Sequence, residues 1–334
     1  MASIANAQDN FKKEFHEEYD VKEGNLFEIS NKFGDIKIEN TKADKITIDA
    51  VIIVEARSKE KADKIMEKIS VKISKSGNTV KAITDIGNIT TNKSSFEINY
   101  TVTMPAYLNI NLNNKYGNVT INELQGKSNL IVKYGSLNVN RIIDGHEKPL
   151  SSIDLGYCER SKINEFNWGK LSIKYSKIEV VSGKALAISS KYSKLNLGSF
   201  SSIAIDAGYD DYSIKNVKNM VVTSKYSDFE IEKLTKNLNV DNKYGDITVT
   251  SIPDGFEAIS IESRYADIEL GIAEDANYQI MAKTSYADIK YNDLKIKQRI
   301  KEDYRTEING YSGSESTKAK VKISSDYGDV DLRE

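Results

Sequence analysis

The sequence predicts an all-β fold, a single-stranded β-helix whose short strands stack into a solenoid. A short motif, seen most fully at residues 242–249 (NKYGDITV), recurs along the chain, and its aromatic residue returns at a nearly constant spacing. Apolar and polar residues alternate on both sides of that aromatic residue. A fixed period near twenty residues is typical of solenoids, and alternation at period two is typical of strands with one buried face. We therefore expect coils of ~17–23 residues, wound right-handed.

Twelve copies of the motif align on their aromatic residue. These aromatic residues are Phe33, Tyr116, Tyr134, Tyr157, Tyr175, Tyr192, Tyr209, Tyr226, Tyr244, Tyr265, Tyr286 and Tyr327. In nearly every copy the residues four before, three after and five after the aromatic are apolar, which predicts that they face the core. Before the aromatic residue the apolar positions lie at even offsets from it, and after it they lie at odd offsets. The alternation therefore shifts by one residue at the small residue after the aromatic, such as Gly245 or Ser193, and this predicts a tight corner between two strands. We also predict that the aromatic rings face inward and stack as an interior tyrosine ladder at the ~4.8 Å strand spacing.

The position two residues before the aromatic is small and polar in many copies. Its members include Asn31, Asn114, Ser190, Ser224, Asn242, Ser263, Thr284 and Ser325. A buried polar stripe can mark a site, or it can be a ladder of hydrogen bonds that supports the corner. Repetition along the whole stack favours the second interpretation.

Composition fits a thin solenoid and excludes several classes of protein. Of 334 residues, 39% are hydrophobic and 29% are charged. The net charge of −2 indicates no broad attraction to nucleic acid or anionic membrane. No apolar run approaches the ~20 residues of a membrane span. The single cysteine, Cys158, cannot form an internal disulfide.

The first hundred residues predict an arm and then a cap. We expect residues 1–25 to be an N-terminal arm, in which residues 8–25 are either frayed or a first strand. Within it, Ala5-Asn6-Ala7-Gln8 resembles the end of a signal peptide and is a remnant of the cleavage region. Residues 26–105 should form N-terminal strands and a capping helix, since Ser58 is a good N-cap and the apolar pattern runs to about Ile69. A hairpin is predicted around Gly77. The end coil of a solenoid exposes backbone groups, so we expect residues 45–104 to cover it.

Residues 106–334 should form the β-solenoid proper. Longer gaps between copies predict loop insertions at 142–149 and 253–255. The longest excursion, residues 294–316, is rich in turn residues and should form a loop or cap at the C-terminal end.

Few residues carry reactive chemistry. His16 and His146 have no nearby Cys or His at ligand spacing, so a zinc site is not expected, and no nucleophile elbow flanks either one. Cys158 occupies a small corner position and should be buried. The adjacent pair Asp210 and Asp211 could act as acid and base or hold calcium, but its corner position favours solvated residues. We therefore expect no catalytic, cofactor-binding or metal-ligating residue, and no cofactor.

Two columns of charge flank the aromatic column. The basic column contains Lys32, Lys115, Lys133, Lys174, Lys191, Lys225, Lys243 and Arg264, and the acidic column contains Asp35, Asp211, Asp228, Asp246, Asp267, Asp288 and Asp329. They could form a charged stripe that grips an anionic glycan. We favour a solvated edge where the two columns offset each other.

The motif copies resemble a known family. The segments 31–36 (NKFGDI), 100–105 (YTVTMP) and 114–119 (NKYGNV), with the Lys-Tyr-Ser and Lys-Tyr-Gly copies that follow, resemble secreted bacterial proteins, common in Bacteroidetes, that are named adhesins and whose function is unknown. The resemblance covers nearly the whole chain. It implies a single-stranded β-helix on the cell envelope or outside the cell, and it offers no catalytic motif to carry over.

The sequence thus predicts a non-enzymatic β-solenoid that is exported to the periplasm, the cell surface or the extracellular space. It would serve in adhesion, glycan or surface binding, or scaffolding, with a glycan or protein as partner, no nucleic acid and no membrane span. One alternative is a polysaccharide lyase or hydrolase with a carboxylate site beside residues 294–316. Another is a self-assembly module that forms a homo-oligomer through a solenoid end.

Overall fold

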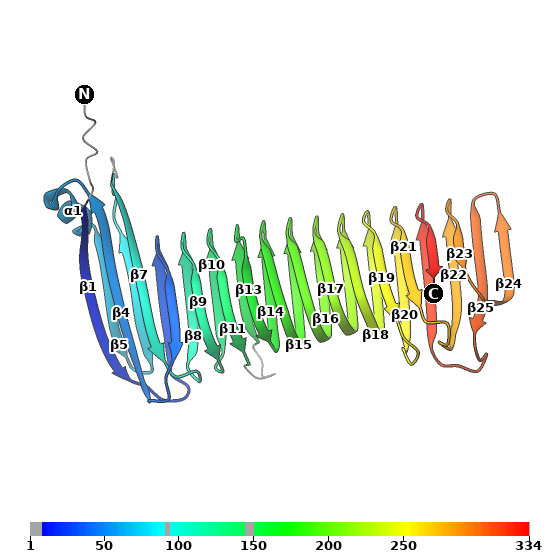
Figure 1. Cartoon of the computed structure of the whole chain (residues 1–334), viewed down its shortest axis with the longest axis horizontal. Coiled ribbons are helices and arrows are strands. Elements are labelled where there is room, and N and C mark those ends of the chain that lie inside the picture. The colour runs from blue at the N-terminus through cyan, green and yellow to red at the C-terminus, as the bar shows by residue number, and fades with distance from the viewer. Residues whose placement is uncertain (1–8, 91–93, 144–149, 334) are drawn as a thin grey trace, which may run out of the picture. The chain divides into compact units, whose positions relative to one another are not determined.

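The protein is a β-solenoid, as the sequence predicts. The computed structural model describes residues 9–90, 94–143 and 150–333. These residues form 27 strands and one short helix (Figure 1). The chain divides into two compact units, residues 1–165 and 166–334, and each is described by itself. The region 5–8, predicted as a signal-cleavage remnant, lies outside the described residues.

The first unit opens with an antiparallel sheet. Its strands are β1 (Asp9–Asp20), β4 (Lys45–Ala56) and β7 (Ser95–Met104), with β4 paired to both others. The predicted helix follows as α1 (Lys59–Met66), where the hydroxyl of Ser58 accepts a hydrogen bond from the backbone N–H of Lys61. The helix buries Ala62, Ile65 and Met66. The predicted hairpin at Gly77 is also confirmed, joining β5 (Ile69–Ser76) to β6 (Thr79–Ile86).

The repeats of the first unit form two parallel stacks of strands. One stack contains β2 (Leu26–Lys32), β8 (Asn109–Lys115), β10 (Ser128–Lys133) and β12 (Ser151–Gly156). The other contains β3 (Ile36–Asn40), β9 (Val119–Leu124), β11 (Leu137–Ile142) and β13 (Ser161–Phe166). The first motif copy therefore stacks directly on the second, with Ile29 beside Leu112, although about eighty residues separate them.

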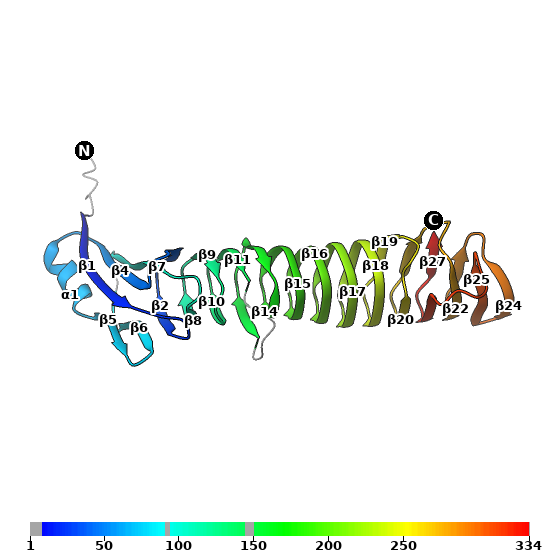
Figure 2. The ribbon, with the colours of Figure 1, turned by 90° about the horizontal axis from the view of Figure 1, so that it is seen from below.

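The second unit continues the same construction with longer strands, seen as successive turns in Figure 2. Its first strands are β14 (Trp168–Lys174), β15 (Lys177–Lys191), β16 (Lys194–Gly208), β17 (Asp211–Lys225) and β18 (Asp228–Lys243). They pair in parallel, so that Ile188, Ile205 and Val222 lie side by side in the core. Aliphatic residues at equivalent positions of each coil thus form continuous buried columns.

The last strands do not stack in chain order. They are β19 (Ile247–Ile252), β20 (Ala258–Arg264), β21 (Ile268–Ile272), β22 (Tyr278–Ser285), β23 (Ile289–Tyr291), β24 (Lys295–Glu302), β25 (Arg305–Ser312), β26 (Lys320–Asp326) and β27 (Val330–Arg333). Strand β26 lies between β20 and β22, and β27 lies between β21 and β23. The segment 294–316, expected as a loop or cap, forms β24 and β25, which continue antiparallel from β22.

The corner of each coil corrects one prediction. Every aligned aromatic residue has a φ of 50° to 63°, the left-handed region. A left-handed residue interrupts the alternation, so the residues two before and one after it both face inward and the aromatic side chain faces outward. The aligned tyrosines are 40% to 56% exposed, and the prediction that they line the interior is wrong. The phase changes at the aromatic residue itself, at a cost of about 1–2 kcal/mol per left-handed residue.

The polar position two residues before the aromatic supports this corner. Asn114 donates a hydrogen bond to the backbone carbonyl of Gly34 at 3.1 Å, and Ser325 donates to that of Gly328 at 2.8 Å. Thr284 donates in the same way to Ala287 at 2.8 Å. These side chains are buried and satisfy carbonyls that the turn leaves unpaired. The interpretation as a ladder of structural hydrogen bonds is therefore supported.

Candidate functional site

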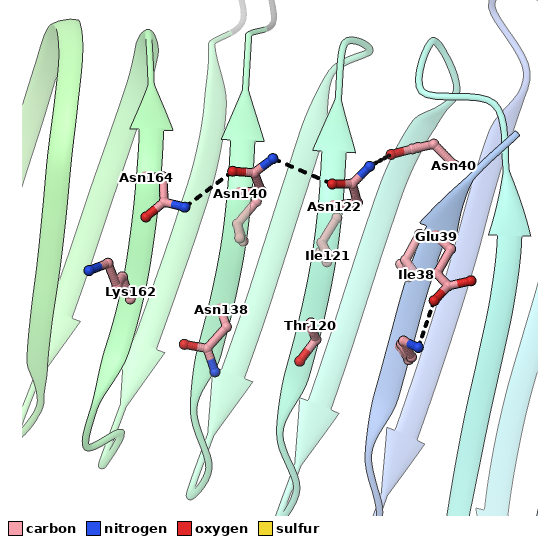
Figure 3. A pocket seen from close by; sticks show the side chains of 12 residues that line it. Ile38, Glu39, Asn40, Thr120, Ile121, Asn122, Asn138, Asn140, Lys162 and Asn164 are labelled. Atoms are coloured by element: carbon pink, nitrogen blue, oxygen red, sulfur yellow. Dashed lines mark hydrogen bonds and ion pairs between the residues drawn. The ribbon is translucent and has the colours of Figure 1, made fainter.

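An open groove of about 770 Å³ lies on the outer face of β3, β9, β11 and β13 in the first unit (Figure 3). We call it the amide groove, and it is lined by Lys37, Ile38, Glu39, Asn40, Thr120, Ile121, Asn122, Asn138, Val139, Asn140, Lys162 and Asn164. In each strand the alternation buries the aliphatic residue and turns its polar neighbours outward. Parallel stacking then brings equivalent polar residues together across the strands.

Four asparagines form a chain of amides along the groove. The side-chain N–H of Asn122 donates to the amide oxygen of Asn40 at 3.1 Å. Asn140 donates to Asn122 at 3.4 Å, and Asn164 donates to Asn140 at 3.1 Å (Figure 3). A carboxamide has two N–H donors and an oxygen with two lone pairs. Asn122 and Asn140 are exposed and each spends one donor and one acceptor on the chain, which leaves further hydrogen-bonding capacity facing solvent.

Ion pairs balance the charge around the groove. On β3, Lys37 pairs with Glu39 at 2.6 Å. Beside the asparagines, Arg141 bridges Glu123 at 3.0 Å and Glu165 at 2.9 Å. The hydrogen bond that Arg141 donates to Glu165 and the charges of both carboxylates raise the pKa of Arg141. The groove therefore presents amides within a nearly neutral setting, not a field of one sign.

The exposed aromatic rings form a second surface. In the first unit Phe33, Tyr116, Tyr134 and Tyr157 stack at centroid distances of 4.9 to 5.0 Å. In the second unit a longer row of stacked tyrosines, which we call the tyrosine ridge, has centroid distances of 4.7 to 5.0 Å between neighbouring rings. Its stacking order is Tyr175, Tyr192, Tyr209, Tyr226, Tyr244, Tyr265, Tyr327 and Tyr286. Each ring face covers the next, so the ridge offers ring edges and hydroxyl groups to a partner. The flat sugar stacking that single exposed aromatics allow is blocked along it.

The charged columns beside the rings have structural contacts. The ammonium groups of Lys115 and Lys191 lie 4.9 and 5.1 Å from the ring centres of Tyr116 and Tyr192. On the other side, the carboxylate of Asp228 accepts the backbone N–H of Asp246 at 2.9 Å, and Asp246 does the same for Asp267 at 2.9 Å. The acidic column thus satisfies corner N–H groups of the next coil. These contacts support the interpretation as an offset, solvated edge.

Asp210 and Asp211 do not converge. The Asp210 side chain is 2% exposed and accepts hydrogen bonds from the Ser190 hydroxyl at 2.7 Å and from the backbone N–H groups of Ser193 at 2.7 Å and Gly208 at 2.8 Å. Its burial raises the pKa of the carboxyl group. The expectation that it is solvated is wrong, because Asp210 fills the inward corner position that serine holds in neighbouring coils. Asp211 points outward into solvent as expected.

The remaining candidate residues do not group with one another. Cys158 is buried, as predicted, and burial raises the pKa of its thiol. His16 is exposed, and a hydrogen bond of 2.7 Å to Asp49 raises its pKa, while His146 lies outside the described residues. Within residues 9–90, 94–143 and 150–333, no group of three or more His, Cys, Asp or Glu side chains is placed to hold a metal ion. In the same ranges no helix is both long and apolar enough to cross a membrane.

A model of the Toastrack DUF4097 family matches residues 21–333. The chain belongs to this family. Similar solved structures include a "putative cell adhesion protein" from Clostridium sporogenes, at 10% identity over 96% of this Toastrack chain and 99% of that chain, with a TM-score of 0.17. Two proteins titled "putative adhesin", from Parabacteroides distasonis and Bacteroides fragilis, are 10% and 14% identical. Each covers 77% of this chain, and the matches span 97% and 96% of those chains with TM-scores of 0.35 and 0.29. No curated protein matches the chain.

Sequence reasoning missed the amide groove of this Toastrack protein, although a signal was present. An asparagine follows the second buried aliphatic residue in the pairs Ile121-Asn122, Val139-Asn140 and Ile163-Asn164. This column is as regular as the lysine and aspartate columns over these coils. In the second unit the equivalent position is an asparagine once, at Asn292 after Tyr291, so the run of consecutive asparagines belongs to the first unit, as a local site within a repeat array requires.

Proposed function

We propose that this protein is a non-enzymatic, exported binding module that holds an extended neutral glycan in the amide groove. The observation that carries the proposal is the chain of exposed amides at Asn122, Asn140 and Asn164, repeated once per strand. Export rests on the small-x-small segment at residues 5–7. The glycan would belong to a cell surface or the extracellular space.

The chemistry of a neutral sugar suits the groove. Sugar hydroxyls donate and accept hydrogen bonds at once, as carboxamides do, so each rung can meet a hydroxyl in either role. The rungs follow the ~4.8 Å strand spacing, which is comparable with the repeat of an extended sugar chain. A strongly anionic chain would find no excess of positive charge, because the lysine, arginine and glutamate side chains here are largely paired.

Binding without hydrolysis is favoured by the state of the nearby carboxylates. Glycoside hydrolysis requires two carboxyl groups that flank the bond to be broken. Among the described residues, Glu39 is the one carboxylate that lines the groove, and it pairs with Lys37. The acidic side chains next to the asparagines, Glu123 and Glu165, both bind Arg141. Neither of these two carboxylates lines the groove, and one guanidinium group engages both.

The test compares two asparagine columns of the same unit. Asn122→Leu with Asn140→Leu removes the central rungs of the groove, while Asn129→Leu removes an asparagine of β10 that pairs with Asn111 at 2.9 Å outside the groove. The probes are immobilised cellulose, chitin and mannan oligosaccharides, with polygalacturonate as the anionic comparison. We expect wild type to retain a neutral glycan and the double variant to bind at least about tenfold more weakly, since two hydrogen bonds of ~1 kcal/mol are lost.

Asn129→Leu should bind like wild type. A folded wild-type protein that retains no neutral glycan would contradict the proposal. So would an equal loss in the Asn129→Leu control, which would indicate a general effect on the fold.

A further inference from the structure

A second opening, of about 340 Å³, lies on the antiparallel sheet of β1, β4 and β7. We call it the end pocket, and its lining includes His16, Asp49, Val51, Asn99 and Thr101. It belongs to the same compact unit as the amide groove, so strand pairing defines where the two openings lie relative to each other.

The end pocket begins on the strand next to the one where the amide groove ends. Strand β7 is the hydrogen-bonded neighbour of β3, and Thr101 of the end pocket lies beside Lys37 of the groove. In register, one residue per strand from β1 to β11 forms a single row: His16, Asp49, Thr101, Lys37, Thr120 and Asn138. The first three line the end pocket, and the last three line the amide groove, where Figure 3 labels Thr120 and Asn138. The two openings therefore lie on one face of one continuous sheet.

The end pocket has the hydrogen-bonding groups that a neutral sugar needs. The amide oxygen of Asn99 accepts the backbone N–H of Asp35 at 2.8 Å, so the amide N–H donors of Asn99 are left for a ligand. The hydroxyl of Thr101, an exposed residue, can both donate and accept. Val51 lies beside Asn99 and is half-buried, and the C–H face of a sugar ring can pack against its methyl groups. The pocket thus combines a small apolar surface with polar groups, as ligand pockets do.

A histidine and a carboxylate lie where the end pocket reaches the edge strand β1. The Nδ1 atom of His16 is 2.7 Å from the carboxylate of Asp49. Nδ1 carries the hydrogen, because an ionised carboxylate can only accept, and Nε2 is left to bind a sugar hydroxyl. The other charged residues of the lining, Lys12 and Glu14, have opposite signs. The end pocket is therefore nearly balanced in charge, as the amide groove is.

We propose that the two openings are one cleft, in which the end pocket binds the sugars of a chain that extends beyond the amide groove. The inference rests on the proposed glycan binding and adds to it a preference for long chains. At ~4.8 Å between neighbouring strands, the amide groove spans roughly 14 Å from β13 to β3, and the cleft spans roughly 29 Å from β13 to β1. Since this spacing is comparable with the repeat of an extended sugar chain, the groove holds about four sugars and the cleft about seven.

The experiment is calorimetric titration of the full chain with neutral oligosaccharides of two lengths. The probes are the tetraose and the hexaose of the cellulose, chitin and mannan series. A hexaose can place four sugars in the amide groove in several registers, which by itself strengthens binding at most about threefold. We expect the hexaose to bind at least about tenfold more tightly than the tetraose, because its further sugars make hydrogen bonds in the end pocket.

A double variant removes the polar groups of the end pocket. His16→Val with Thr101→Val should leave the affinity for the tetraose unchanged and reduce the advantage of the hexaose to about threefold or less. The matched control is Glu18→Val with Thr103→Val, two residues further along the same strands and outside both openings. It should bind the hexaose like wild type.

A second measurement needs no substitution. The chain has only two histidines, so the imidazole signals of His16 can be followed by NMR. We expect them to shift when the hexaose is added and to stay in place with the tetraose.

The outcomes separate this inference from the proposed function. A hexaose advantage of threefold or less in wild type would overturn the single cleft and leave glycan binding in the amide groove intact. So would an advantage that survives in the His16→Val, Thr101→Val variant, or one that is lost equally in the control. Wild type that binds none of the neutral oligosaccharides would overturn the proposed function, and the cleft with it.

Discussion

The ring of Tyr327 lies parallel to that of Tyr265 at a centroid distance of 4.8 Å, and the two differ by only 6° in orientation. The contact places the final motif copy inside the stack and not at its end. Strand β26 then has a hydrogen-bonded neighbour on each side, β20 and β22. The last residues of the chain thereby connect the β22–β25 segment to the coils before it.

We predict that removing residues 318–334 releases this C-terminal segment. Without β26 and β27, strand β22 loses its parallel partner and keeps only the antiparallel partner β25. An isolated antiparallel group of three strands with little core is marginally stable. Hydrogen exchange should become fast in β22, β24 and β25 and stay slow in β16 and β17. Unchanged protection in β22 would contradict this account of the last strands.

Replacing a ridge tyrosine should show the strain of the corner. Tyr244→Ala loses stacking on two neighbours, about 0.5–1.5 kcal/mol each, and leaves a non-glycine residue in the left-handed conformation. Tyr244→Gly loses the same contacts but relieves the strain. We therefore expect glycine to be less destabilising than alanine by about 1 kcal/mol, as measured by urea unfolding.

At an ordinary strand position glycine is more destabilising than alanine, because glycine weakens strands. A buried ring would have cost about 3–5 kcal/mol on truncation. Lys243→Ala, beside the ring, should cost well under 1 kcal/mol. Alanine at position 244 that is as stable as glycine, or stability losses near 4 kcal/mol, would contradict the outward assignment.

Gly135 should tolerate no side chain. A Cβ atom there would lie 2.0 Å from the backbone oxygen of Gly117 in the neighbouring coil. We expect Gly135→Ala to lower the free energy of unfolding by more than about 2 kcal/mol, since neither backbone can move without breaking the parallel register. The control is Ser193→Ala, at the equivalent position of a corner that accepts a side chain. It loses the hydrogen bond from the Ser193 hydroxyl to the Lys191 carbonyl and the one that this hydroxyl accepts from the backbone N–H of Ser176, each worth about 0.5–1.5 kcal/mol, but it introduces no clash. Equal losses at both positions would contradict the clash.

Asp210 should make stability depend on pH in the acid range. Burial raises the pKa of this carboxyl group in the folded state, so the folded protein binds a proton more readily than the unfolded chain. Stability from this group is therefore present below the unfolded pKa and is lost as the pH rises through the folded pKa. We expect wild type to gain stability relative to Asp210→Asn as the pH is lowered from 7 to 4, measured by urea unfolding at each pH. A difference that does not vary with pH would mean that the carboxyl group does not titrate differently on folding.

The fold could be predicted because the alternation of apolar residues is nearly unbroken through twelve copies. The outward direction of the Tyr244 side chain could not be predicted. A period-two pattern assigns alternate residues to the two faces of a strand, and it does not show where a left-handed residue interrupts that alternation. The position of Tyr327 before Tyr286 was hidden for another reason. Every copy has compatible core residues, and the strand order follows from the antiparallel pairing of β22 with β25, which occupies one edge of β22 and leaves the other edge to β26. The amide groove was overlooked because Asn122 and Asn140 are ordinary exposed residues until parallel stacking joins them.

The terminal strand β24 should prevent association through the end of the solenoid. Among the described residues its only strand partner is β25, so its other edge has unpaired backbone groups. Its sequence carries Lys295, Lys297, Arg299 and Lys301, and charged edge strands discourage pairing with another chain. We predict that changing Lys297, Arg299 and Lys301 together to threonine makes the protein associate into oligomers. Light scattering over a range of protein concentrations measures the association. Threonine at Lys215 and Lys218 serves as the control, and a triple variant that scatters like this control would show that the edge is closed by something other than charge.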